Sequence, residues 1–348
     1  MKNVLSSRTA GSCILATLIA CGAASSNNLQ QAPATPPISP GTQWLATNGS
    51  SIQAHGGGMI KVGTTYYWIG ENKTNGATFY ANSCYSSTDL ATWTFVNNTL
   101  TMQASGDLGP NRIVERPKIV YNSSTQTYVM YMHIDNKSYS EAKVGVATSP
   151  TVCGNYTYLG SFQPLGFQSR DIGLFQDADG SAYLLSEDRV NGLRIDALSA
   201  DYLSVTKAVA VLLDMEAPAM VKVGPAYFIF CSHLSGWKTN DNQYATASSL
   251  AGPWTALADF APAGSDTFNS QTAYVLPVSG NAGTTYIYMG DRWVPDNLAT
   301  SPYIWLPLTI SGTSATMSWQ SQWSINAAAG TWSTVSGSQP QASPKLSR

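Results

Sequence analysis

Glu216 is placed where a chain could hold a catalytic acid. It is followed by Ala217-Pro218 and by a run that reads as a wholly apolar strand, so the carboxylate lies at the mouth of a strand and not inside it. A carboxyl group held beside other charged groups at such a mouth can keep its proton and donate it to a substrate. We therefore take Glu216 as the leading candidate for a proton donor.

Four more strand beginnings along the chain carry polar or charged residues. They are His55, Glu115 with Arg116, Arg170 with Asp171, and Gln271. Cleavage of a glycosidic bond needs an acid at the leaving oxygen and a second group that activates water on the opposite face of the sugar. A nearby carboxylate raises the pKa of such an acid, and Asp171 suits that role.

The spacing of these strand beginnings predicts the fold. The steps from His55 through Glu115, Arg170 and Glu216 to Gln271 are about 60, 55, 46 and 55 residues, and each round reads as four short strands. Four-stranded units of this kind bury their faces by stacking on their neighbours. We expect an all-β protein, a five-bladed β-propeller, whose inner strands bring the five beginnings to one end of a central channel.

Exposed aromatic residues beside the channel would stack on the apolar face of a sugar. The best candidates are Trp237 in Ser235-Gly236-Trp237 and Trp293, which follows Asp291-Arg292. Arg292 is a further candidate sugar contact. Most of the other aromatic residues are expected in the cores of the blades.

The composition of the 348 residues is that of an exported, turn-rich protein. Charged residues make up only 11% of the chain, whereas Gly, Tyr and Trp are plentiful, and the net charge is -2. No basic stripe or polybasic run is present, so neither a nucleic acid nor an anionic membrane surface is expected as a partner. We expect a monomer.

The N-terminus reads as an export signal over residues 1–21. Its end, Leu18-Ile19-Ala20-Cys21, resembles the lipobox of bacterial lipoproteins, which implies lipidation of Cys21; an ordinary cleaved signal peptide is the alternative. Residues 22–42, rich in Pro and Ser, are expected to be a flexible tether, 43–330 the propeller and 331–348 a polar tail. The protein would then be periplasmic or on the cell surface and would meet the membrane only through its lipid.

Three further cysteines remain, Cys84, Cys153 and Cys231. Cys84 with Cys153 is one candidate disulfide in an exported protein, and Cys231, within an apolar run, is expected to be a buried thiol. The three histidines lack closely spaced acidic partners, so no metal site is predicted, although a structural cation in the channel stays open.

Long phrases along the chain resemble glycoside hydrolase family 43, and within it the exo-β-1,3-galactanases. They include IQAHGGGMIKVGTTYYWIGENK, ERPKIVYN, SRDIGLFQDADGSAYLL, EAPAMVKV, FNSQTAYVLPV and GDRWVPDNLATSPYIWLPL. The resemblance covers residues 43 to about 330 in the right order. It implies a five-bladed propeller that hydrolyses glycosidic bonds with inversion and requires no cofactor.

The resemblance also implies roles for single residues. The proton donor falls on Glu216 and the carboxylate that tunes its pKa on Asp171. Most of the family opens the first blade with an Asp base, but this chain has Gln53-Ala54-His55-Gly56 there. The galactanase group uses a glutamine, which matches Gln271 and would position water or act through its imidic acid tautomer.

Glu115 is the rival base and otherwise a substrate ligand. By the same resemblance Glu71, Arg116 and Tyr139 are candidate sugar contacts. The implied activity is the release of galactose from the non-reducing end of β-1,3-galactan, as in the backbone of arabinogalactan. Two alternatives remain: an α-L-arabinofuranosidase or β-xylosidase, and a carbohydrate-binding propeller without catalysis, which the missing first-blade Asp suggests.

Overall fold

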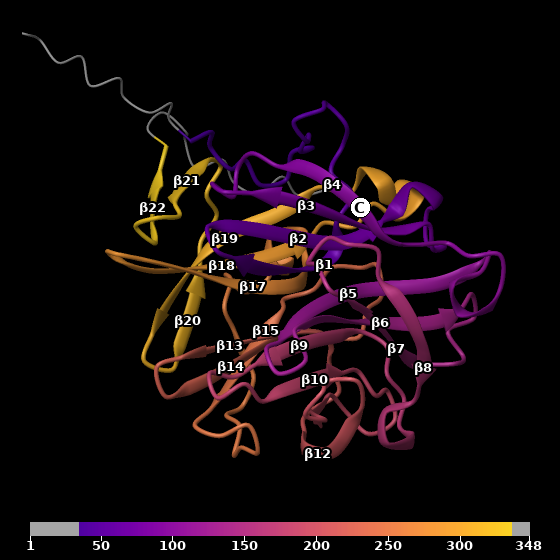
Figure 1. Ribbon diagram of the computed structural model, residues 1–348. Coiled ribbons are helices and arrows are strands. Elements are labelled where there is room, and N and C mark those ends of the chain that lie inside the picture. Colours follow the sequence, from indigo (N-terminus) through magenta and orange to yellow (C-terminus); the bar gives the residue numbers. More distant parts are fainter. Residues whose placement is uncertain (1–34, 336–348) are drawn as a thin grey trace, which may run out of the picture. The chain divides into compact units, whose positions relative to one another are not determined.

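The computed structural model describes residues 35–335. The expected signal peptide, the lipid attachment site Cys21, most of the expected tether and much of the tail fall outside these residues. Over residues 35–335 the chain folds into five four-stranded antiparallel sheets and one two-stranded hairpin (Figure 1).

Each four-stranded sheet is one blade and is built from consecutive strands. The first three blades are β1 (His55–Val62), β2 (Thr65–Asn72), β3 (Ala81–Ser87), β4 (Thr94–Thr101); β5 (Arg112–Asn122), β6 (Thr127–Asn136), β7 (Lys143–Ser149), β8 (Thr157–Phe162); and β9 (Ile172–Gln176), β10 (Ala182–Ser186), β11 (Arg194–Leu198), β12 (Val205–Val211). The last two are β13 (Glu216–Val223), β14 (Ala226–Ser232), β15 (Gln243–Ala247), β16 (Ala258–Asp259); and β17 (Gln271–Gly280), β18 (Gly283–Asp291), β19 (Tyr303–Ser311), β20 (Ser314–Met317).

The first strands of the five blades surround a common centre. β1 contacts β5, β5 contacts β9, β9 contacts β13, β13 contacts β17, and β17 returns to β1 (Figure 1). This closed ring confirms the predicted five-bladed β-propeller. The strand beginnings that carry the candidate residues therefore lie around one end of the ring.

The blades are held together by the apolar faces that they stack on one another. In the fourth blade, Phe228 and Phe230 of β14 are fully buried and pack with Tyr288 and Leu306 of the fifth. Because both faces of such a blade are covered by neighbours, its strands read as continuous apolar runs instead of alternating ones.

A disulfide links the first two blades. Cys84 of β3 bonds to Cys153, which follows β7, and Asn97 of β4 donates to the Cys153 carbonyl at 3.0 Å. The predicted candidate pair is thus confirmed. Cys231 is a buried free thiol, also as expected.

The propeller extends beyond the boundaries expected from the sequence. Ile38 and Trp323 exchange backbone hydrogen bonds of 2.7 and 3.1 Å, and Ile38 is buried. Trp323 begins the hairpin of β21 (Trp323–Asn326) and β22 (Thr331–Thr334). Ile38 pairs with Trp323 and β22 pairs with β21. Some residues expected in the tether and the tail therefore belong to the domain.

Short helices join some strands: η1 (Lys73–Asn75), η2 (Gly106–Leu108), η3 (Pro164–Gly166), α1 (Asp266–Asn269) and η4 (Pro295–Thr300). Within residues 35–335 there is no helix with the length and hydropathy needed to cross a membrane. The connection that matters most for the site is η1, because it carries Lys73 toward the centre of the ring.

Candidate active site

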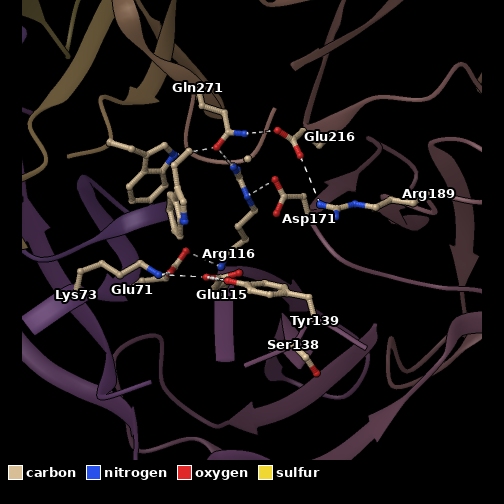
Figure 2. Close-up of a pocket in the computed structure, with 13 residues that line it drawn as sticks. Glu71, Lys73, Glu115, Arg116, Ser138, Tyr139, Asp171, Arg189, Glu216 and Gln271 are labelled. Atoms are coloured by element: carbon tan, nitrogen blue, oxygen red, sulfur yellow. Dashed lines mark hydrogen bonds and ion pairs between the residues drawn. The ribbon is translucent and has the colours of Figure 1, made fainter. Parts of the chain in front are cut away.

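A cavity of about 390 Å³ opens where the inner strands begin. Nine residues singled out in the sequence line it: Glu71, Glu115, Arg116, Tyr139, Asp171, Glu216, Trp237, Gln271 and Trp293. Figure 2 shows how the charged side chains among them converge from different blades. Lys73, Ser138, Arg189 and Gly236 also line the cavity and were not predicted.

Backbone bulges at the starts of the inner strands aim the site residues. The ladder register shifts just after His55 in β1, after Glu115 in β5 and after Glu216 in β13. The residue that follows each of the three, Gly56, Arg116 or Ala217, has φ of +53°, +52° or +56°. A left-handed residue inside a bulge bends the strand and turns the preceding side chain toward the centre.

A second set of polar residues lies opposite the first on the neighbouring strands. His55 pairs with Glu71, Glu115 with His133, Glu216 with Ser232, and Gln271 with Asp291. In the third blade, Glu187 N donates to Asp171 O at 2.9 Å, which makes Glu187 the equivalent residue. Each blade thus brings two polar side chains to the end of the ring.

Glu216 is buried and is held among other carboxylates. Burial raises the pKa of Glu216, and Asp171 and Glu187 raise it further, to about 8. Arg189, whose side chain is 47% exposed, pairs with Glu187 and approaches Glu216 Oε2 at 3.8 Å. At neutral pH the Glu216 carboxyl group therefore keeps its proton, as a general acid must.

Arg116 forms the floor between the blades. Its Nε lies 2.8 Å from Asp171 Oδ2, its Nη2 donates to Gln271 Oε1 at 2.6 Å, and its Nη1 donates to the Thr272 carbonyl at 2.9 Å. Its backbone N–H donates to Glu71 Oε1 at 2.9 Å. Asp171 is therefore paired with Arg116, and not with its sequence neighbour Arg170, which bonds to Gln168 and to the Tyr139 carbonyl.

Gln271 lies directly beside the acid. Its Nε2 donates to Glu216 Oε1 at 3.0 Å and to Ser232 Oγ at 3.2 Å. Its Oε1 accepts from Arg116 and from Trp293 Nε1, the latter at 2.9 Å. Both lone pairs of this oxygen are engaged, and the amide does not stand across the cavity from Glu216, where the second group of an inverting pair would be expected about 6.5–9.5 Å away.

Glu115 lies on the other side of Arg116 from Glu216 (Figure 2). Burial would raise the pKa of Glu115, but Lys73, 3.4 Å away, His133 and the Tyr139 hydroxyl hold it down at about 2. Burial also acts to lower the pKa of Lys73, yet the carboxylates of Glu71 and Glu115 raise it. Glu115 is consequently an anion at every ordinary pH.

Two indoles complete the wall of the cavity. The rings of Trp237 and Trp293 meet edge to face with centroids 5.0 Å apart, and Lys73 Nζ lies 5.5 Å from the Trp237 ring. Such surfaces suit the apolar face of a sugar. Arg292 does not line the cavity, because its guanidinium donates to the carbonyls of Phe268 and Asn269, so the expected sugar contact is corrected.

The channel below the floor holds a buried lysine, and burial and Arg116 lower its pKa to about 7. Lys118 is buried, and its Nζ donates to the Gly56 carbonyl at 2.5 Å and lies 3.5 Å from the Arg116 carbonyl. Above it, the ligand atoms of Asp171, Glu187 and Glu216 lie within 4.8 Å of one another, a spacing that a metal ion could span. Arg116 and Arg189 already pair with members of this cluster.

Two site residues that the sequence did not single out follow the second strand of the third blade. Glu187 and the flanking Arg189 follow β10 in Ser186-Glu187-Asp188-Arg189, just as Glu71 lies near the end of β2 and Asp291 ends β18. The sequence signal that could have found them is a polar residue at the end of the second strand of each blade. Lys73 lies in η1, a turn that the sequence repeat does not predict.

The chain is similar to a protein family and to several solved structures. A family model described as glycosyl hydrolases family 43 matches residues 54–263. An exo-β-1,3-galactanase from Phanerochaete chrysosporium, solved with galactose, is 45% identical with a TM-score of 0.84, over 87% of this chain and 71% of that chain. A form of the same enzyme solved with β-1,3-galactotriose is 45% identical with a TM-score of 0.83, over 86% and 71%.

An exo-β-1,3-galactanase from Clostridium thermocellum is 35% identical with a TM-score of 0.83, over 87% of this chain and 69% of that chain. A search of curated proteins finds no match. The propeller, the cavity of converging carboxylates and these similarities agree with one another: the chain belongs to glycoside hydrolase family 43.

Proposed function

We propose that this protein is an inverting exo-β-1,3-galactanase that releases galactose from the non-reducing end of β-1,3-galactan. The observation that carries the proposal is Glu216, buried at the cavity with its pKa raised to about 8. Three solved structures similar to this chain are of exo-β-1,3-galactanases, two of them with galactose or β-1,3-galactotriose.

The hydrogen bonds of Glu216 indicate which oxygen carries its proton. Oε1 accepts N–H groups from Gln271 at 3.0 Å and from Ser235 at 3.2 Å. In a neutral carboxyl group, the oxygen that accepts two N–H donors is the carbonyl oxygen. We therefore assign the proton to Oε2, from which it passes to the leaving oxygen of the glycosidic bond.

Water activation is proposed for Glu115. It accepts from Tyr139 at 3.1 Å and lies near Lys73, yet it retains acceptor capacity toward the cavity. Gln271, the alternative implied by the resemblance, has both oxygen lone pairs engaged and orients the acid. The low pKa of Glu115 makes it a weak base, but one that is always ionised.

The proposed step conserves its protons. Glu216 gives its proton to the departing galactan oxygen as the C–O bond breaks, while a water oxygen bonds to the anomeric carbon from the opposite face and loses a proton to Glu115. The product is α-galactose and a chain shorter by one sugar. The proton on Glu115 then returns through solvent to Glu216.

The proposal is tested by hydrolysis of β-1,3-galactan, arabinan and xylan oligomers by the wild-type protein and the Glu216→Gln variant. We expect cleavage of the galactan alone and a loss of about 10²–10⁴-fold in the variant, the range for removal of a general acid. Preferred cleavage of arabinan or xylan, or a Glu216→Gln variant within a fewfold of wild type, would refute it.

A further arm of this assay separates the two candidates for water activation. Glu115→Gly leaves room for azide, which attacks without needing a base. If Glu115 activates water, azide restores turnover and forms α-galactosyl azide. If azide rescues Gln271→Gly instead, the role belongs to Gln271.

A further inference from the structure

His133 lies behind the proposed water-activating carboxylate and belongs to a line of alternating charges. It pairs with Glu115 across the β5–β6 ladder and is buried. Its Nδ1 lies 3.4 Å from Glu115 Oε2, and its Nε2 lies 3.0 Å from Asp135 Oδ2. With Lys73 on the far side of Glu115, the order is Lys73, Glu115, His133, Asp135.

Asp135 is fixed by the loop that follows it. Its carboxylate accepts the backbone N–H groups of Asn136 at 2.9 Å, Glu141 at 2.8 Å and Ala142 at 3.0 Å. The loop that these bonds close carries Tyr139, whose hydroxyl donates to Glu115 Oε1 and whose ring lies 5.9 Å from His133. The backbone thus fixes Asp135, Asp135 fixes the imidazole, and the imidazole faces Glu115.

We propose that His133 is a permanently protonated positioning residue, which holds Glu115 ionised and oriented toward the cavity. Nε2 is within hydrogen-bond distance of Asp135, and Nδ1, which has no hydrogen-bond partner, lies 3.4 Å from Glu115 Oε2. Only the doubly protonated imidazolium presents an N–H to both carboxylates. The partner on β7 is Val144, which is apolar, so among the described residues the polar groups in contact with the ring are Glu115, Asp135 and Tyr139.

The electrostatics of the site agree with this geometry. Burial would lower the pKa of His133, but hydrogen bonds to Asp135 and Glu115 raise it to about 9. Glu115 and Asp135 are correspondingly held at pKa values of about 2. Removal of the imidazolium charge should therefore raise the pKa of Glu115 toward its ordinary range.

The kinetic test rests on the proposed function and uses the pH dependence of kcat/KM on β-1,3-galactan. His133→Gln keeps hydrogen-bonding groups but has no charge. We expect its acidic limb to move up by one pH unit or more while the alkaline limb, set by Glu216, stays in place. His233→Gln, at an exposed histidine, should leave both limbs unchanged.

A second test does not depend on activity. The chain has three histidines, so NMR titration of their ring protons is assignable from the His133→Gln and His233→Gln spectra. His133 should remain an imidazolium through pH 8. This readout applies even if the substrate proves to be another glycan.

Two results would overturn the inference. One is a His133 ring that titrates below pH 7 in the folded wild-type protein. The other is a folded His133→Gln variant whose acidic limb lies within 0.3 units of wild type, which would reduce His133 to a structural residue. If His133→Gln does not fold, the His55→Gln and His233→Gln spectra assign the other two rings, and the titration of the wild-type protein then decides.

Discussion

Burial and the neighbouring carboxylates of Asp171 and Glu187 raise the pKa of Glu216 and so make it an acid. Glu216 could be selected from the sequence because a carboxylate before Pro218 and an apolar strand is unusual, and Asp171 because it opens another inner strand. Glu187 could not be selected from the sequence, because it follows a second strand that carries no distinctive pattern. Its role depends on the backbone pairing that places it opposite Asp171. Tertiary packing buries Glu187 beside Glu216, and a single sequence does not predict that packing.

The pH dependence of kcat/KM tests the protonation state of Glu216. Because Glu216 must be protonated, kcat/KM should fall as pH rises through about 8. Glu187→Gln removes one of the carboxylates that raise the pKa of Glu216 and leaves Arg189 free to pair with it. The alkaline limb should therefore shift down by roughly one unit, measured as kcat/KM from pH 5 to 10.

Asp179→Asn serves as the matched control, because Asp179 lies in an exposed turn of the same blade. Its profile should coincide with that of wild type. An unchanged alkaline limb in Glu187→Gln would show that Glu187 does not tune the acid.

Three of the five inner strands, β1, β5 and β13, have a bulge directly after their first site residue. The sequence predicts the strands, since their apolar runs and turn residues are plain, and it places Glu216, Gln271 and His55 at strand beginnings as the structure does. It does not predict the left-handed backbone at Arg116 and Ala217, because neither residue type signals it. Nor does it predict that β5 begins at Arg112, ahead of Glu115.

The bulge of the first blade offers a test with a matched pair of glycines. Gly56 and Gly63 have φ of +53° and +61°, but a Cβ on Gly56 would collide with Glu71 Oε1, whereas a Cβ on Gly63 meets nothing within 4 Å. Gly63→Ala should cost only the dihedral strain, about 1–2 kcal/mol. Gly56→Ala should cost roughly 1–3 kcal/mol more through overpacking.

Urea unfolding measures both free energies, and kcat/KM on galactan reports the site. Gly56→Ala should also lose activity, because Glu71 is tied to Lys73 and to the Arg116 backbone. Equal stability and activity of the two variants would show that the bulge tolerates a side chain and does not fix Glu71.

For the whole molecule, closure of the ring is the feature that the sequence predicts least well. The repeat indicates five blades, but it does not show how the last joins the first. In the structure the segment before β1 spans that junction: Ile38 pairs with Trp323, and Trp44 contacts Trp68 of the first blade and Trp305 of the fifth. The Ile38–Trp323 pair joins residues about 285 positions apart, a separation that no local pattern reveals.

Ile38→Ala tests whether this segment stabilises the domain. Ile38 is 3% exposed, so its truncation should cost roughly 2–5 kcal/mol of unfolding free energy. Leu45→Ala, at a side chain 57% exposed, should change stability by about 0.5 kcal/mol or less. Equal effects in thermal or urea unfolding would mean that the segment before β1 contributes little to stability.

The central claim is that the converging carboxylates hydrolyse β-1,3-galactan with inversion. Proton NMR of the first sugar released from β-1,3-galactotriose, recorded faster than mutarotation, tests it most directly. The account predicts that α-galactose and galactobiose appear first and that the β anomer grows in later. Initial release of β-galactose, or no hydrolysis of the trisaccharide, would contradict it.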